Sequence, residues 1–205
     1  RVGIIGATGM VGQRFATLLE HHPWFHVEAL AASSHSAGKT YEEALAGRWK
    51  MNMPIPENMK NMVVLDAEKD RKKITDSVDF VFCAVNMDKQ KAKELEESYA
   101  KSECPVISNN SANRGVPDVP MIIPEINPDH AKVIETQRKR LGTKRGFIAV
   151  KSNCSIQSYV PAITPLLDLG VTKVLACTYQ AISGAGRTFD TWPEMIDNVI
   201  PFIGG

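Results

Sequence analysis

A cysteine at the start of a predicted helix is the residue in this chain best suited to nucleophilic chemistry. Cys154 follows Ser152 and Asn153, between a predicted strand over 147–150 and a predicted helix over 154–167. A thiol at a helix N-terminus faces the positive end of the helix dipole and free backbone N–H groups, which lower its pKa and favour the thiolate. By position alone, the alternative of a small buried residue that caps the helix is favoured.

The other three cysteines have settings less suited to catalysis. Cys83 and Cys177 lie inside apolar runs predicted as strands, where they would be inert core thiols, and Cys104 precedes Pro105 at the start of a strand. The four cysteines form no CxxC pair, and no Cys/His group has zinc-site spacing. We therefore expect a reduced, intracellular and cytoplasmic protein without a metal site.

A glycine-rich turn near the N-terminus has the spacing of a dinucleotide-binding loop. The segment 6–12 is GATGMVG and lies between a predicted strand and a predicted helix. Glycines there permit a tight turn and a close approach of backbone N–H groups to a pyrophosphate, whose charge the helix N-terminus stabilises. The GxxGxxG spacing is a variant of GxGxxG, and an ordinary strand-to-helix turn is the alternative. Its place at the start of a strand–helix–strand pattern favours dinucleotide binding.

The end of the second predicted strand indicates which dinucleotide would bind. An NAD site requires a carboxylate about 20 residues after the glycine loop, to accept the ribose 2′-OH. The segment 31–39 contains Ser33, Ser34 and Lys39 and no Asp or Glu. Hydroxyls, backbone N–H groups and a lysine suit a 2′-phosphate, so the sequence predicts NADP. A capped turn is the structural alternative for the two serines.

The elements that position these residues alternate between apolar runs of strand length and helix-period segments. This alternation predicts an α/β fold, a Rossmann-type doubly wound parallel sheet, over about the first 150 residues. The predicted strands are 2–5, 27–32, 62–65, 78–84, 105–108 and 147–150, and the predicted helices are 11–20, 88–101, 130–140 and 154–167.

The pattern changes in the last quarter of the chain. A long β-branched run over 171–181 predicts a strand, and a Gly-rich loop follows at 183–186. One helix, one strand and one loop cannot enclose a core. We therefore expect an NADP-binding domain over 1–151, and over 152–205 the start of an incomplete α+β catalytic and dimerisation domain. Its apolar surface would need cover from a further segment or another subunit.

Composition and charge exclude several classes of protein. The 205 residues are 43% hydrophobic and 23% charged, which is typical of globular chains rather than disordered ones. The formal net charge is +1, and the densest basic cluster, within 138–145, is short, so we expect no nucleic-acid partner. No run approaches the ~18 apolar residues of a membrane span, so we expect no membrane partner.

Four motifs in this chain occur together and in one order: GATGMVGQRF at 6–15, SNNSANR at 108–114, SNCS at 152–155 and TYQAISGAGR at 178–187. In these motifs the chain resembles aspartate-semialdehyde dehydrogenase, in particular its archaeal and fungal-type branch. The motifs span essentially the whole chain, so the resemblance is specific. It implies an oxidoreductase that binds NADP and forms a homodimer or homotetramer.

The resemblance also implies roles for individual residues. Cys154 would be the nucleophile, Asn153 would help to hold the thioester oxygen, and Gln180 would orient the substrate. Arg114 would bind the substrate's phosphate or carboxylate. Without the resemblance, Arg114 could be an exposed loop residue and Gln180 a strand-terminal surface residue. The residues implied to contact the cofactor are Thr8, Gly9, Met10 and Val11 at the pyrophosphate, Ser33 and Ser34 at the 2′-phosphate, and Ser183, Gly184 and Gly186 beside the nicotinamide.

A nucleophilic thiol and NADP on one chain suit a phosphorylating aldehyde dehydrogenase, which passes through a cysteine thioester. The resemblance implies reductive dephosphorylation of aspartyl 4-phosphate to aspartate 4-semialdehyde, in the biosynthesis of lysine, threonine and methionine. The alternatives are a related reductase of malonyl-CoA or N-acetyl-glutamyl phosphate, and a non-catalytic NADP-binding module. A short-chain epimerase or reductase is excluded, because no tyrosine is followed four residues later by lysine.

The chain departs from the family pattern in one respect. The family uses a histidine as general acid and base, and a further arginine for the substrate carboxylate, both well after the cysteine. All five histidines here precede Cys154, and Arg187 is the only basic residue after Lys173. We therefore expect the proton-transfer histidine to lie outside these 205 residues. If they were the entire polypeptide, NADP binding would be weak and turnover poor or absent.

Overall fold

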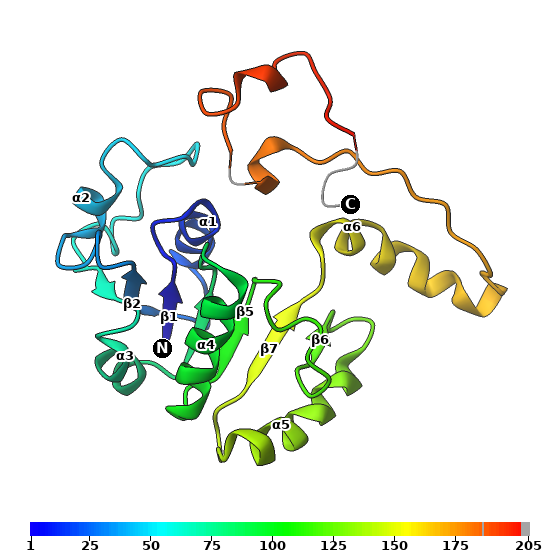
Figure 1. The fold of residues 1–205 in the computed structure, drawn as a ribbon, viewed down its shortest axis with the longest axis horizontal. Coiled ribbons are helices and arrows are strands. Elements are labelled where there is room, and N and C mark those ends of the chain that lie inside the picture. Colours follow the sequence, from blue (N-terminus) through cyan, green and yellow to red (C-terminus); the bar gives the residue numbers. More distant parts are fainter. Residues whose placement is uncertain (186, 202–205) are drawn as a thin grey trace. The chain divides into compact units, whose positions relative to one another are not determined.

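The computed structural model describes residues 1–185 and 187–201, and its main feature is a seven-stranded parallel sheet (Figure 1). The sheet order is β3-β2-β1-β4-β5-β7-β6. The order reverses between β1 and β4, which is the topological switch point of a doubly wound fold and confirms the predicted Rossmann-type class. The strands are β1 Val2–Ile5, β2 Val27–Ala32, β3 Leu65–Asp66, β4 Phe80–Cys83, β5 Val106–Ser108, β6 Met121–Ile122 and β7 Ile148–Lys151.

Helices lie in most connections between successive strands, as is usual for parallel pairing, but 109–120 between β5 and β6 contains none. The α-helices are α1 Met10–Leu19, α2 Tyr41–Leu45, α3 Arg71–Ser77, α4 Lys89–Lys101, α5 Ile134–Leu141 and α6 Cys154–Ile163. The 3-10 helices are η1 Pro128–Val133, η2 Thr164–Leu169, η3 Ile182–Ala185 and η4 Pro193–Met195.

Two hydrophobic clusters cover the two faces of the sheet. Alternate residues of a strand point to opposite faces, so Ile5 and Ala31 belong to one cluster, whereas Ile4 and Leu30 belong to the other. All four are fully buried. Burial on both faces explains why these strands are continuous apolar runs in the sequence.

Several predicted boundaries differ from the structure. The predicted strand over 62–65 is displaced to Leu65–Asp66, and the predicted helix over 130–140 begins as the 3-10 helix η1. The α-helical part of 154–167 ends at Ile163, with Pro161 inside its last turn. Proline removes a main-chain donor and clashes with the preceding turn, which explains the early end.

The chain divides into two compact units, Arg1–Pro165 and Leu166–Gly205. In the second unit the prediction of a strand over 171–181 is wrong, because these residues have no regular secondary structure and all are exposed. β-branched residues favour a strand only where a neighbouring strand supplies hydrogen bonds and packing. Cys177 is therefore exposed rather than a core thiol. Within the described ranges, no helix is long and apolar enough to cross a membrane.

Candidate active site

A cleft with a volume of about 300 Å³ lies at the carboxyl ends of β1 to β4, where the strand order reverses. Ligands of open α/β sheets bind at this position. The cleft brings together segments far apart in the sequence, and its lining includes Gly6, Thr8, Gly9, Ser33, Ser34 and Lys69.

Two glycines of the loop are required by close packing. Gly6 has φ +88°, and a Cβ there would lie 2.5 Å from the carbonyl oxygen of Ala84. A Cβ at Gly12 would overlap the carbonyl oxygen of Gly6. Gly9 differs, because a Cβ there would only touch the Gly6 oxygen at 3.4 Å. Gly6 and Gly12 therefore shape the turn, whereas Gly9 leaves the cleft side of the loop open.

Main-chain bonds hold this loop to the end of β2. The N–H groups of Gly6 and Ala7 both donate to the carbonyl oxygen of Ala31, at 2.8 and 3.0 Å. The buried hydroxyl of Tyr41 donates to the carbonyl oxygen of Ala7 at 2.8 Å, and burial raises the pKa of Tyr41. The tyrosine is therefore a neutral donor that supports the loop from behind.

A buried glutamine links the same loop to the segment after α2. The Gln13 amide donates to the carbonyl oxygens of Thr8 and Arg48, at 3.1 and 3.0 Å. Its oxygen accepts from the N–H of Lys50 at 2.8 Å. Gln13 is 2% exposed, and its three hydrogen bonds all join main-chain groups. The side chain therefore fixes the loop.

The cleft side of the loop carries unused donors. Helix α1 begins at Met10, and Gly9 before it supplies no side-chain cap. Among the described residues, the N–H groups of Thr8, Met10 and Val11 have no acceptor. Free N–H groups and the positive end of a helix dipole suit a pyrophosphate.

The predicted 2′-phosphate residues lie on the cleft wall after β2. Ser33 and Ser34 are exposed, and the turn there uses the carbonyl oxygen of Ser33, which accepts from Ser36 and Ala37 N–H. The hydroxyls of Ser33 and Ser34 have no hydrogen-bond partner among the described residues, so they are not used to hold the turn. Lys69 lines the cleft as well, which sequence reasoning missed.

The only carboxylate at the end of a strand in this cleft belongs to β3 rather than β2. Asp66 accepts from the N–H groups of Glu68 and Lys69, both at 2.9 Å. The bond from Lys69 is the largest influence that holds the pKa of Asp66 below its usual value. This carboxylate is therefore ionised and bound to its own loop.

Cys154 is the first residue of α6 and is exposed. The helix cap is Asn153, whose side-chain oxygen accepts from the N–H of Ser155 at 2.8 Å. The structural alternative for Cys154, a small buried capping residue, is therefore wrong. Because the cap uses the Asn153 oxygen, the NH₂ group of that side chain stays available as a donor. Cys83 is buried as predicted. Cys104 is buried as well, and burial raises its pKa to about 12.

The side chain of Arg114 is hydrogen-bonded to a residue that lies close to Cys154 in the sequence. Its Nε donates to the carbonyl oxygen of Lys151 at 3.1 Å, and Nη2 donates to that of Asn109 at 3.3 Å. Lys151 ends β7, three residues before Cys154. The alternative of an exposed loop arginine is wrong, because Arg114 is half-buried. Burial and then the charge of Arg114 lower the pKa of Lys151, so two cations share this region.

Sequence reasoning missed a buried carboxylate behind the 108–114 segment. Glu96 on α4 is 1% exposed and accepts hydrogen bonds from Ser108, Asn110 and Asn113. The charged residues of 88–101 predict a surface helix, in which a buried carboxylate is not expected. A usable signal was the position of Glu96 four residues after Ala92 and four before Ala100, which places it on the buried face of the helix.

The remaining predicted site residues belong to the second unit. Gln180 is exposed and follows no strand, and a Cβ on Gly184 would overlap its side-chain amide. Ser183 and Gly184 lie in η3, so this part of the predicted loop is a 3-10 turn. Gly186 lies outside the described residues.

The switch-point cleft and its glycine loop define a dinucleotide-binding protein of the Rossmann class. A family model described as "Semialdehyde dehydrogenase, NAD binding domain" matches residues 1–134. The chain belongs to this family.

Curated relatives extend the similarity over the whole chain. It is 40% identical to aspartate-semialdehyde dehydrogenase of Aspergillus fumigatus over 207 residues, and 42% identical to that of Methanothermobacter thermautotrophicus over 205 residues. Both matches cover 100% of this chain, and 55% and 56% of those proteins. The chain thus spans about half the length of the curated relatives that it matches, and the resemblance found in the sequence is confirmed.

A solved structure agrees with the sequence relatives. The crystal structure of aspartate-semialdehyde dehydrogenase with NADP from Candida albicans matches at a TM-score of 0.80 and 36% identity. The match covers 100% of this chain and 56% of that one.

Proposed function

We propose that this chain supplies the NADP site and the nucleophile of an aspartate-semialdehyde dehydrogenase, which reduces aspartyl 4-phosphate to aspartate 4-semialdehyde. The observation that carries the proposal is an exposed Cys154 at the start of α6, three residues after Lys151, whose carbonyl oxygen anchors Arg114. The names of the relatives from three organisms support the same reaction.

The cleft residues fit NADP. The free N–H groups of Thr8, Met10 and Val11 would bind the pyrophosphate, and the open side of Gly9 leaves room for it. Ser33 and Ser34 would donate to the 2′-phosphate, with Lys69 on the same cleft as a countercharge. Asp66 lies at the end of β3, whereas the 2′-OH acceptor of an NAD site is expected at the end of the second strand, and the Asp66 Oδ1 accepts two main-chain bonds from its own loop. NADPH supplies the hydride that reduces the acyl group.

Each step at the acyl carbon has a candidate group in the chain. The Cys154 thiolate would attack the acyl carbon, forming a carbon–sulfur bond as the carbon–oxygen bond to phosphate breaks. The Asn153 NH₂ group would donate to the acyl oxygen, where negative charge develops. Arg114 would hold the departing phosphate with its guanidinium. After reduction, the carbon–sulfur bond breaks, the aldehyde leaves and the thiolate is restored.

Four residues of the second unit have roles that only the family resemblance supports. It assigns substrate orientation to Gln180, and contact with the nicotinamide to Ser183, Gly184 and Gly186. The support for these four roles is the resemblance of TYQAISGAGR at 178–187 to the family motif.

Substrate choice can be tested in the natural polypeptide that contains residues 1–205. NADPH oxidation is measured with aspartyl phosphate, malonyl-CoA and N-acetyl-glutamyl phosphate, and we expect aspartyl phosphate to be used best. Cys154→Ala should lower kcat by about 10⁴-fold or more. Cys177→Ala is the matched control, because Cys177 is also a free and exposed cysteine. Preference for another acyl compound, or undiminished turnover of Cys154→Ala, would refute the proposal.

We further propose a cytoplasmic location and a homodimer or homotetramer. The location is supported by four free cysteines, which suit a reducing compartment. The assembly is supported by exposed apolar side chains in the second unit, such as Leu175 at 94% and Tyr179 at 89%. Light scattering of the natural polypeptide would give the subunit number, and a monomer at micromolar concentration would contradict the assembly.

A further inference from the structure

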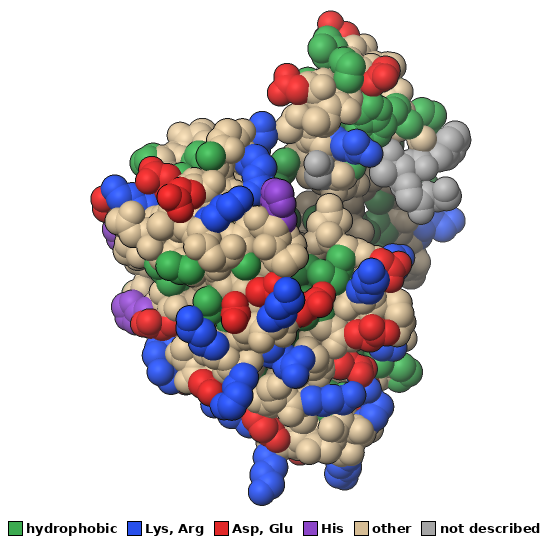
Figure 2. Space-filling view, turned by 60° about the vertical axis from the view of Figure 1, so that its left-hand side comes forward, with side chains coloured by type: hydrophobic (Ala, Val, Ile, Leu, Met, Phe, Trp, Pro, Cys, Tyr) green, Lys and Arg blue, Asp and Glu red, His purple; other side chains and the backbone are tan. Residues whose placement is uncertain are grey.

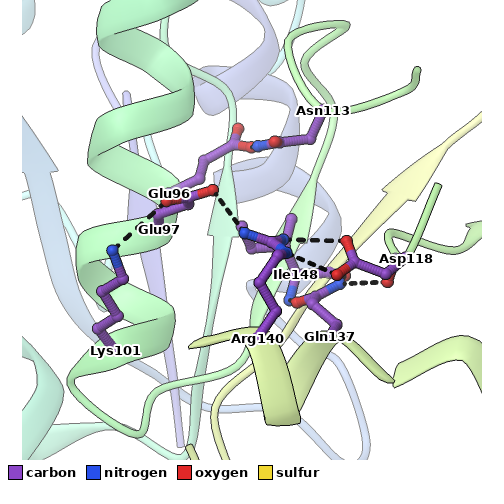
Figure 3. Close-up of polar contacts among 8 residues, drawn as sticks. All are labelled: Glu96, Glu97, Lys101, Asn113, Asp118, Gln137, Arg140 and Ile148. Atoms are coloured by element: carbon purple, nitrogen blue, oxygen red, sulfur yellow. Dashed lines mark hydrogen bonds and ion pairs between the residues drawn. The ribbon is translucent and has the colours of Figure 1, made fainter. Parts of the chain in front are cut away.

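Glu96 is a buried carboxylate with no assigned role in the proposed chemistry. Its side chain is on the inner face of α4, next in sequence to Glu97, which forms surface ion pairs with Arg140 and Lys101 (Figure 3). A buried carboxylate is costly unless hydrogen bonds compensate it. Glu96 therefore has to be explained by its bonding partners.

All three partners come from one segment. Glu96 Oε1 accepts from Ser108 Oγ at 2.6 Å and from Asn110 Nδ2 at 2.8 Å. Oε2 accepts from Asn113 Nδ2 at 2.6 Å, and Figure 3 shows these two side chains directed toward one another. In all three bonds the carboxylate is the acceptor. One side chain thus holds both ends of the turn that follows β5.

The held segment leads directly to Arg114. Asn113 precedes Arg114, and the guanidinium reaches from there to the carbonyl oxygens of Asn109 and Lys151. β5 and β7 are neighbours, with Ser108 in register with Val150. A shift of the segment relative to β7 would therefore move the guanidinium away from the start of α6.

We propose that Glu96 is a positioning residue that holds the 108–114 segment so that Arg114 meets the anionic group of the acyl substrate beside Cys154. This inference rests on the proposed function. Glu96 touches neither substrate nor cofactor in this account. It acts through Asn110 and Asn113, whose side-chain amides fix the backbone on either side of the turn.

The first test is Glu96→Gln in the natural polypeptide that contains residues 1–205. With Asn113 in its present orientation, the substitution sets an NH₂ group against the Asn113 NH₂ group. If the Asn113 amide turns so that its Oδ1, which has no partner among the described residues, accepts instead, its NH₂ group loses its present acceptor. We expect KM for aspartyl phosphate to rise about tenfold, with KM for NADPH within about twofold of wild type. Glu97→Gln is the matched control, because it removes the same charge from a surface ion pair of the same helix. An unchanged KM for aspartyl phosphate would overturn the proposal.

The second test reverses the polarity of one bond. In Glu96→Gln/Asn113→Asp, the new amide can donate to the new carboxylate, while its oxygen keeps the bonds from Ser108 and Asn110. We expect KM for aspartyl phosphate to return to within about threefold of wild type. Asn113→Asp alone should raise this KM more than Glu96→Gln or the double variant does. A double variant no better than Glu96→Gln would overturn the proposal, even if the single variant folds poorly.

Amide hydrogen exchange separates this inference from the proposed function. In Glu96→Gln, exchange over 108–116 should accelerate about tenfold, while exchange over 2–19 and in Glu97→Gln stays unchanged. If wild type does not reduce aspartyl phosphate, the proposed function fails, and the exchange measurement still decides whether Glu96 holds the segment. If wild type does reduce it and Glu96→Gln exchanges normally, this inference alone fails.

Discussion

Two loops at the carboxyl edge of the same sheet are held in place by different groups. The glycine loop at 6–12 is fixed by main-chain bonds to β2, by bonds from the neutral side chains of Gln13 and Tyr41, and by close packing around two glycines. The segment at 108–114 is fixed by side-chain amides and a hydroxyl that converge on Glu96. The loop that must present main-chain N–H groups to an anion is therefore held by neutral groups, whereas the segment that must present Arg114 is held by a buried carboxylate.

The difference determines how each loop should fail. The glycine loop should be destabilised by added atoms, because there is no space for a Cβ at position 6 or 12. The 108–114 segment should be destabilised when its buried polar groups lose a hydrogen-bond partner. Four predictions test this contrast, in order of decreasing effect.

The largest effect on stability should come from Gly12→Ala. The added Cβ would overlap the carbonyl oxygen of Gly6, so the loop or α1 must shift, at about 3 kcal/mol in the free energy of unfolding. NADP affinity should fall more than tenfold. Gly9→Ala is the control, because its Cβ meets only an ordinary contact and should cost under about 1 kcal/mol. Equal unfolding free energies in urea for the two variants would refute the steric account.

The second loop should be weakened less, by Glu96→Ala. The substitution leaves Ser108, Asn110 and Asn113 without their shared acceptor, so we expect the free energy of unfolding to fall by about 2 kcal/mol. Glu97→Ala should cost under about 1 kcal/mol, since it only removes surface ion pairs. Urea midpoints of both variants give the comparison, and the reverse order would contradict a holding role for Glu96.

Alkylation rates test whether the second loop also supports the nucleophile. Cys154 and Cys177 are both exposed, but only Cys154 has a helix N-terminus and the cations Arg114 and Lys151 in its region. Iodoacetamide at neutral pH should label Cys154 about tenfold faster than Cys177, and Arg114→Gln should reduce that difference. Equal rates at both positions would favour a non-catalytic NADP-binding module.

The smallest effect should be a change in acid stability at the wall of the cleft. Hydrogen bonds hold the pKa of Asp66 below that of the unfolded chain, so its ionised form stabilises the fold above about pH 4. This stabilisation is lost as the pH falls through the folded-state pKa. Asp66→Asn should therefore show a shallower loss of stability below about pH 4 than wild type. The free energy of unfolding is measured in urea titrations between pH 2 and 7. An equally steep fall at low pH in wild type and Asp66→Asn would contradict this prediction.

The sequence was sufficient to predict the glycine loop and most of the sheet before residue 150, because the loop is a local motif and most strands are apolar runs. The role of Arg114 was implied by the family resemblance alone, and its anchoring on Lys151 was not predicted. Glu96 escaped prediction because its partners lie 12 to 17 residues away on a different element. The run over 171–181 has strand propensity, but propensity cannot report the absence of a pairing strand. The two-residue strand β6 is too short to produce a pattern.

Covalent capture of the acyl group tests the central claim most directly. The natural polypeptide that contains residues 1–205 is mixed with aspartyl phosphate in the absence of NADPH, quenched in acid and analysed by intact mass and peptide mapping. The account predicts release of one phosphate per chain and one aspartyl group on the peptide that carries Cys154. An aspartyl group on any other residue, or no added mass on an enzyme that turns over with NADPH, would contradict it.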